Sequence, residues 1–220
     1  MKNKLRGKIL LALFLVVPIV WVLLWKSGKH NYSSLPVYGS VEMTGDTIPF
    51  VIPEFSFINQ YGQVISDKDF KDKIYVANFF FATCPDVCPE MNNNLTVVYD
   101  KFKNHDNVML LSHTVHPEHD SVAVLAAYAK KLNVTDNKWQ FVTGNKAALY
   151  RMAEYEYRLT ATKGSGPKDF IHSEMLVLID TDKHIRGYYN GRDFKEIQKL
   201  NDGIKVLLKE ERDKKNKPGK

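Results

Sequence analysis

The chain has 220 residues, 44% of them hydrophobic and 25% charged, and its formal net charge is +6. This length is enough for one domain of ordinary size, so its two cysteines are not needed to staple a miniature scaffold. The basic excess lies in the tails: residues 1–29 have six Lys or Arg and no acid, and residues 205–220 have a net charge of +4, which leaves −4 for residues 30–204. An acidic domain without a basic, aromatic-rich face argues against a nucleic-acid partner.

The N-terminus has the pattern of a membrane anchor. Four basic side chains in MKNKLRGK precede residues 9–25, an uncharged run that would span about 25 Å as a helix. This run is long enough for a short bilayer span and longer than the apolar centre of a cleaved signal peptide, and no small-residue cleavage site follows in Lys26-Ser27-Gly28. Because the basic flank stays in the cytoplasm, we expect a single-pass inner-membrane protein with its C-terminal domain on the periplasmic side. A cleaved signal peptide is the less favoured alternative.

Apolar periodicity predicts an α/β domain after this anchor. In chain order we expect a hairpin over 53–66, a buried strand over 73–83, a helix over 91–102, a strand over 108–115, a helix over 121–134, a strand over 139–144, a helix over 145–160, a hairpin from 173 onward, and a helix over 194–211. The first hairpin turns at Tyr61-Gly62. Asp120 or Ser121 caps the helix over 121–134, and Asn145 caps the helix over 145–160. Strands that alternate with helices are typical of a mixed sheet covered on both faces. The order of elements resembles thioredoxin with an added helix and strand.

The cysteines, Cys84 and Cys88, follow the expected strand over 73–83, where a helix begins. Ligand sites favour the carboxyl ends of such strands, and a helix N-terminus stabilises a thiolate. If the segment is helical, this spacing puts both side chains on one face with Cβ atoms roughly 5–6 Å apart, whereas a disulfide has about 3.8 Å between them. The spacing therefore suits a soft metal ion, although a disulfide can form in a looser loop.

A metal site would need a further ligand, because two sulfurs are too few for a tetrahedral zinc site. His172 is the candidate, since it stands in DFIHSEMLVLID just before the last hairpin. In a thioredoxin-like sheet this loop lies beside the cysteine helix. Thiolate and imidazole together suit copper as Cu(I) or Cu(II). On the residues alone, a partly buried histidine with a local hydrogen bond is the simpler alternative for His172.

The pattern F-x-F-A-T-C-P-D-V-C-P, with a distal F-I-H-S, resembles the Sco/SenC proteins over about residues 54–208. These are thioredoxin-like copper chaperones for cytochrome c oxidase assembly. The resemblance implies that Cys84, Cys88 and His172 bind copper. It also implies a partner, cytochrome c oxidase subunit II or another copper-accepting protein, to which the chain delivers copper or whose cysteines it reduces.

The chain departs from this family where the family usually has V-D-P-x-x-D. Here the residues are His113-Thr-Val-His116-Pro-Glu-His119-Asp120, with a histidine in place of the first aspartate. Three interpretations stay open for the three histidines: a second, weaker metal site, a way to pass an ion on, or exposed loop residues. Asp86, between the cysteines, either attracts a metal ion or is an exposed turn residue.

A thiol–disulfide oxidoreductase is the main alternative function, with Cys84 as the attacking thiolate and Cys88 as the resolving thiol. That chemistry would not need His172. A peroxidase or a Cys–His hydrolase is disfavoured because the expected accompanying residues are missing. We therefore expect a metallochaperone rather than an enzyme, with the following organisation: a cytoplasmic basic stretch and transmembrane helix over 1–29, a linker over 30–52, a thioredoxin-like copper-binding domain over 53–209, and a basic tail over 210–220.

Overall fold

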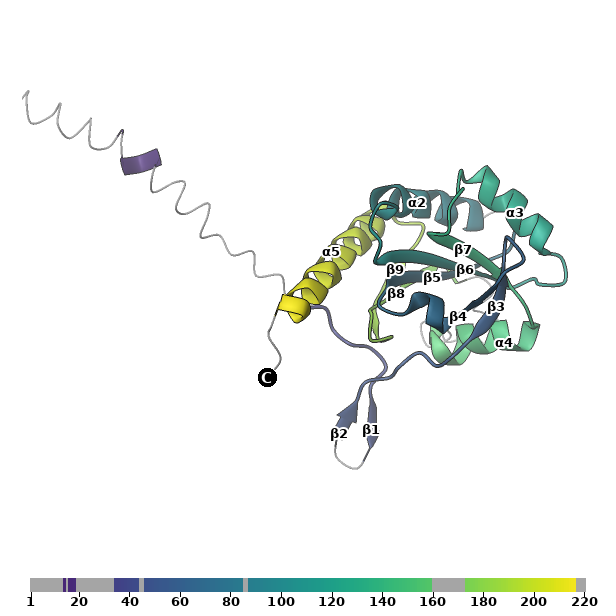
Figure 1. Cartoon of the computed structure of the whole chain (residues 1–220), viewed down its shortest axis with the longest axis horizontal. Coiled ribbons are helices and arrows are strands. Elements are labelled where there is room, and N and C mark those ends of the chain that lie inside the picture. Colours follow the sequence, from purple (N-terminus) through teal and green to yellow (C-terminus); the bar gives the residue numbers. More distant parts are fainter. Residues whose placement is uncertain are drawn as a thin grey trace, which may run out of the picture. The chain divides into compact units, whose positions relative to one another are not determined.

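The computed structural model describes residues 14, 16–18, 34–43, 46–84, 87–159 and 173–216 (Figure 1). Chain contacts divide the protein into two compact units, residues 1–33 and residues 34–220, and the second unit contains the domain. Most of the expected membrane anchor, together with Asp86 and His172, lies outside the described residues. In the part of the chain that the structure describes, no helix is both long and apolar enough to cross a membrane.

A seven-stranded mixed sheet is the centre of the domain within the described ranges, and its strand order is β4-β3-β7-β6-β5-β8-β9. The central strands β5, β6 and β7 run parallel, while β8 and β9 on one side and β3 and β4 on the other are antiparallel to their neighbours. The strand bounds are β3 (Ser56–Asn59), β4 (Val64–Ser66), β5 (Ile74–Phe80), β6 (Val108–Thr114), β7 (Trp139–Thr143), β8 (Met175–Ile179) and β9 (Ile185–Asn190). This arrangement confirms the predicted mixed sheet.

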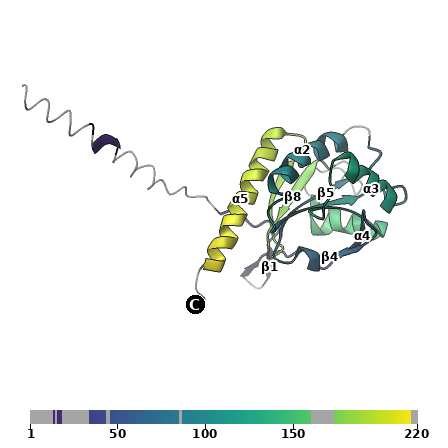
Figure 2. The ribbon, with the colours of Figure 1, turned by 45° about the horizontal axis from the view of Figure 1, so that its top comes forward.

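Helices cover both faces of the sheet, as Figures 1 and 2 show. The helical elements are η1 (Asp67–Phe70), α2 (Val87–Phe102), α3 (Val122–Lys131), α4 (Lys146–Arg151), a π-helical turn η2 (Met152–Glu156), and α5 (Phe194–Asn216). Val76 and Phe80 of β5 belong to the core under α2, α3 and α5, whereas Ala77 and Phe79 belong to the core under α4 and η2. Because both faces are buried, β5 is hydrophobic or aromatic along nearly its whole length rather than alternating.

Local signals in the sequence agree with the structure at several element ends. Gly62 has φ +75° in the β3–β4 turn, as expected for a tight hairpin. The side chain of Ser121 accepts the N–H of the third residue of α3, and the side chain of Asn145 accepts the N–H of the third residue of α4. Helix α2 begins at Val87, four residues before the predicted start, because Pro89 fits the first turn, where its missing N–H is not needed.

Two segments differ from the sequence prediction. The helix expected over 145–160 is regular only to Arg151 and continues as the π-helical turn η2. The segment expected as a linker contains a two-stranded ribbon, β1 (Val41–Met43) with β2 (Asp46–Ile48). Ahead of the ribbon, the N–H of Tyr38 donates to the carbonyl of Ile185 over 2.9 Å. Contacts with the sheet therefore begin well before residue 53.

Candidate metal centre

The two cysteines lie between the end of β5 and the first turn of α2, as the sequence predicts. Cys84 is half-buried, and its N–H donates to the carbonyl of Phe81 over 3.1 Å. Cys88 is the second residue of α2 and is 5% exposed. Both are free thiols. The pair thus occupies the carboxyl end of a central parallel strand, where ligand sites in open sheets gather.

The first turn of α2 directs a backbone donor at the outer sulfur. The N–H of Cys88 points to Sγ of Cys84 at 3.4 Å. The first N–H groups of a helix have no partner within the helix and carry the positive end of its dipole. The sulfur of Cys84 therefore faces the positive end of a helix, a position that suits a nucleophile or a metal ligand.

The inner sulfur has a different character. Burial, followed by the hydrogen bond with Cys84, raises the pKa of the Cys88 thiol to about 12. On its own, the Cys88 thiol stays protonated at neutral pH. A thiol must lose its proton to become a metal ligand, so a soft metal ion that binds both sulfurs releases this proton.

A buried hydrogen-bond network lies under the first turns of α2. Asn92 accepts from the side-chain amide of Asn78 over 3.1 Å and donates to the hydroxyl of Tyr128 over 2.8 Å. The hydroxyl of Ser112 donates to Asn78 and accepts from Nε1 of Trp139. The network joins α2 to α3 and to the three central strands, so it fixes the helix that carries Cys88. Sequence reasoning missed it, because its members are spread from residue 78 to residue 139.

The loop after β6 lies beside the cysteine segment, since β5 and β6 are adjacent and parallel. The N–H of Val115 donates to the carbonyl of Phe80 over 2.9 Å. The N–H of Ala82 donates to Oδ2 of Asp120 over 3.0 Å, and the ring of Phe81 meets the ring of His116 edge-on with centroids 6.3 Å apart. The departure from the family pattern is therefore close to the cysteines.

The structure separates the three histidines of this loop. His113 is fully buried in β6, so its interpretation as an exposed loop residue is wrong. Its ring stacks on Phe79 at 4.7 Å and meets Phe57 and Tyr157 edge-on, and burial lowers its pKa to about 3. Its Nε2 has no hydrogen-bond partner among the described residues. The period of two along the strand puts His113 between aromatic side chains, away from the cysteines.

His116 and His119, by contrast, reach the surface. His116 is half-buried and His119 is exposed. Their rings stack with centroids 4.0 Å apart and planes 21° from parallel. Of the three histidines in the loop, the structure thus brings two together.

The residues that follow His172 reach α2 through Arg192. Its Nε donates to Glu90 over 2.7 Å, and its Nη1 donates to Glu174 over 3.0 Å. Glu90 is two residues after Cys88, and Glu174 is two residues after His172. Strand β8 is antiparallel to β5, so its start lies at the same end of the sheet as the carboxyl end of β5. The sequence has no local signal for this bridge, because three separate segments form it.

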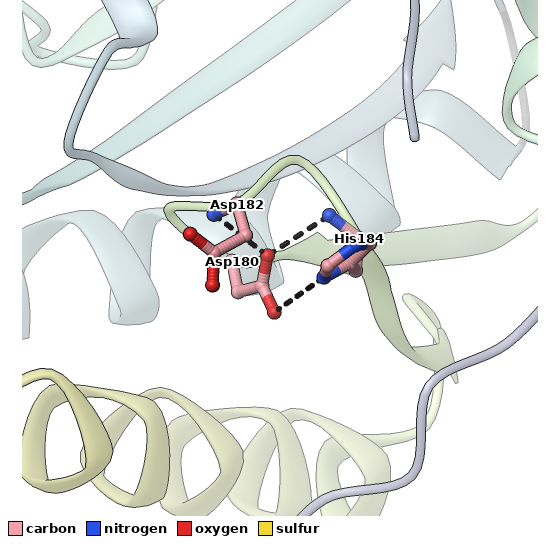
Figure 3. Close-up of side chains that lie close together, drawn as sticks. All are labelled: Asp180, Asp182 and His184. Atoms are coloured by element: carbon pink, nitrogen blue, oxygen red, sulfur yellow. Dashed lines mark hydrogen bonds and ion pairs between the residues drawn. The ribbon is translucent and has the colours of Figure 1, made fainter. Parts of the chain in front are cut away.

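A second group of potential ligands lies in the β8–β9 turn, where oxygen or nitrogen atoms of Asp180, Asp182 and His184 are within 4.8 Å of one another (Figure 3). Asp180 accepts from the backbone N–H groups of Asp182 and His184 and from Nη1 of Arg186. Lys214 donates to Asp182 over 2.8 Å. Because two cationic side chains already neutralise these carboxylates, the group stabilises the turn and does not suit a metal ion. The local sequence D-T-D-K-H, in which these three residues are close together, is a signal from which this group could have been predicted.

A family model for SCO1/SenC matches residues 45–209, about three quarters of the chain. The chain belongs to the SCO1/SenC family. The cysteine segment and the three central strands of this Sco-family protein all fall within the matched range.

Individual relatives agree with this assignment. The chain is 27% identical over 148 residues to the SCO1 protein homolog of Bacillus subtilis, covering 66% of this chain and 77% of the relative. BsSco, a member of the Sco family of cytochrome c oxidase assembly proteins, is 24% identical, with a TM-score of 0.58 over 72% of this chain and 95% of the other. Yeast Sco1, crystallised with copper bound, is 22% identical, with a TM-score of 0.56 over 72% and 94%. The two structural likenesses confirm the predicted thioredoxin-like fold.

Proposed function

We propose that this Sco-family protein is a membrane-anchored copper chaperone. It binds copper through Cys84, Cys88 and His172 and helps to assemble the copper centre of cytochrome c oxidase. The main support is the pair of free thiols at the start of α2, one ahead of the helix and one in its first turn, with the N–H of Cys88 directed at the sulfur of Cys84. The copper bound to yeast Sco1 and the role of the Sco family in oxidase assembly support the choice of metal and partner.

His172 is the third ligand in this proposal. Arg192 holds together the residues two positions beyond Cys88 and two positions beyond His172, namely Glu90 and Glu174. This bridge supports a short distance between the imidazole and the sulfurs. Two thiolates suit Cu(I), and the added imidazole suits Cu(II), so one ligand set serves both oxidation states.

Transfer of the ion requires that each ligand be replaceable. The outer sulfur, Cys84, is half-exposed and is the one that thiols of a partner can reach first. When copper leaves, Cys88 regains its proton, because burial favours the neutral thiol. Cytochrome c oxidase subunit II, or another copper-accepting protein, is the proposed recipient.

The proposed location is the inner membrane. Residues 9–25 would form the anchor, with the basic flank in the cytoplasm and the copper-binding domain on the periplasmic side. A membrane tether would confine the chaperone to the same surface as a membrane-bound oxidase. The affinity needed for each encounter would then be modest.

The test is copper binding by the full chain in detergent, purified with its thiols reduced. Wild type is compared with His172→Ala and with His105→Ala, a control at an exposed histidine in the α2–β6 loop. We expect a Cu(II)–thiolate absorption band that saturates at one equivalent of copper per chain and that is lost or strongly weakened only in His172→Ala. Equal binding by wild type and His172→Ala would remove His172 from the site.

A thiol–disulfide oxidoreductase is the second candidate, favoured by the same N–H contact at Cys84. Its thiolate would attack a disulfide of the partner and form a mixed disulfide. Cys88 would then attack Cys84, which releases the partner as a dithiol and leaves a Cys84–Cys88 disulfide for an external thiol to reduce. No copper in the wild type, together with reduction of a disulfide substrate that His172→Ala retains, would favour this function.

A further inference from the structure

The loop after β6 carries a pair of imidazoles that the proposed copper site does not use. We propose that His116 and His119 form a second metal site, for divalent copper, in this loop. This site goes beyond the proposed function and does not depend on it, because its ligands are separate from Cys84, Cys88 and His172.

The backbone of the loop holds the two histidines at a fixed spacing. The carbonyl of His116 accepts the N–H groups of both His119 and Asp120, over 3.0 and 2.9 Å. The N–H of His116 donates to the hydroxyl of Thr114 over 2.9 Å. The two rings therefore start from one short turn, with centroids 4.0 Å apart. A pre-formed backbone lowers the entropy that two ligands lose when they bind one ion.

The electrostatics of the loop favour a cation. Asp120 is fully buried next to His119, and its Oδ2 accepts from Thr114 and from the N–H of Ala82. Its Oδ1 has no hydrogen-bond partner among the described residues. A buried carboxylate with an unsatisfied oxygen is costly, and a cation bound nearby offsets that cost.

The side chains can move from the stacked arrangement to a chelating one. The lone pair of an imidazole lies in the ring plane, so two stacked rings cannot point at one ion until one of them turns. The exposed His119 ring is free to turn, whereas the His116 ring rests edge-on against Phe81. Imidazole nitrogen suits Cu(II), and Cu(II) binds most tightly of the divalent first-row ions. Phe81 is three residues before Cys84, so an ion held here lies beside the chain that leads from β5 to the cysteines.

The experiment uses the full chain in detergent with Cys84→Ser, Cys88→Ser and His172→Ala, which removes the proposed copper ligands. Cu(II) is titrated, with affinity measured against a competing chelator and nitrogen ligands counted by electron paramagnetic resonance. We expect one bound Cu(II) with two imidazole nitrogens. Loss of an outer partner of a metal site costs 10–100-fold in affinity, so loss of a ligand in His119→Gln or His116→Gln should cost at least about tenfold.

His105→Gln is the matched control, because His105 is another exposed histidine of the same domain and should leave Cu(II) affinity unchanged. His119→Gln keeps the test valid if His116→Gln disturbs the fold, since His119 is exposed. Failure of the background chain to bind Cu(II), or binding that neither His116→Gln nor His119→Gln weakens, overturns the proposal.

The two proposals can fail separately. With the cysteines and His172 intact, the double replacement His116→Gln/His119→Gln should leave the copper–thiolate band in place. If wild type lacks that band, the proposed function is overturned. The proposal for His116 and His119 is then still decided by the Cu(II) titration of the chain without the cysteines and His172.

Discussion

Two turns of this domain gather side chains that bind metals, and they differ in how their lone pairs are already used. In the β8–β9 turn, Asp180 accepts two backbone N–H groups and the guanidinium of Arg186. In the cysteine segment, the sulfur of Cys84 receives one N–H at 3.4 Å, and the buried Cys88 keeps its proton. The comparison teaches that suitable residue types are not enough for a metal site. Their lone pairs must also be available to an ion, and of these two turns the cysteine segment meets that condition.

The largest expected effect comes from removing a proposed copper ligand from the cysteine segment. When the protein is loaded with Cu(I), Cys88→Ser should retain near none of the one ion that wild type holds at its thiolates, because a hydroxyl is a poor ligand for a soft ion. Asp182→Asn, the matched change in the β8–β9 turn, should retain copper as wild type does. Metal analysis after desalting measures both. Full copper retention by Cys88→Ser would contradict the proposed ligand set.

The next largest effect comes from removing the buried cation that pairs with Asp180 in the β8–β9 turn. Arg186 is 8% exposed at its side chain and pairs with Asp180 and Glu210. Arg186→Met leaves the buried carboxylate of Asp180 without its cation, so the free energy of unfolding in urea should fall by about 3–5 kcal/mol. Lys214→Met, at an exposed pair in the same turn, should cost at most about 1 kcal/mol. If Arg186→Met is as stable as wild type, the carboxylates do not need the guanidinium and the turn is open to a cation after all.

A third prediction concerns His113, whose unused Nε2 is closed off by aromatic rings. The pKa of His113 is about 3 in the folded protein, against about 6.5 for an unfolded histidine. At a pH between these two pKa values, the histidine of the unfolded chain binds a proton, whereas the buried His113 of the folded chain stays neutral. Stability should therefore fall as pH drops below 6.5, by about 1.4 kcal/mol per pH unit.

His113→Phe should remove this dependence. Between pH 7 and pH 5 the free energy of unfolding in urea should fall about 2 kcal/mol further in wild type than in His113→Phe. The other titrating groups are common to both proteins, so the difference isolates His113. Parallel pH profiles would show that the buried imidazole accepts a proton without unfolding the chain.

The smallest expected effect tests how the segment that carries His172, the proposed third ligand, is held against α2. Arg192→Gln breaks the exposed bridge between Glu90 and Glu174, so the unfolding midpoint should hardly change. Copper should dissociate faster, by up to about tenfold, because the segment after His172 loses its tie to α2. Lys103→Gln, which breaks a surface pair with Asp100 at the far end of α2, is the control. Equal rates of copper dissociation from wild type and Arg192→Gln would show that Arg192 does not influence the copper site.

Much of the fold was predictable because its signals are local. The caps at Ser121 and Asn145 and the turn at Gly62 depend on residues next to them in the chain. The continuous apolar run of β5 marks a strand buried on both faces. The position of Cys84 and Cys88 after that strand also followed from the order of elements. The assignment of His172 to the same site remains a prediction.

The tertiary structure decided how each potential ligand is used. His113, His116 and His119 follow one another at equal spacing, yet the first is sealed between aromatic rings and the last is exposed. Strand pairing makes that difference, because β6 lies between β5 and β7 and is buried from Leu110 to its last residue, Thr114. The sequence by itself determined most of the elements, the position of the cysteine pair and the family, but not the β1–β2 ribbon or the π-helical turn η2. Availability of a lone pair depends on contacts between residues far apart in the chain, such as Arg186 with Leu35 and Arg192 with Glu90, so only the folded domain decides it.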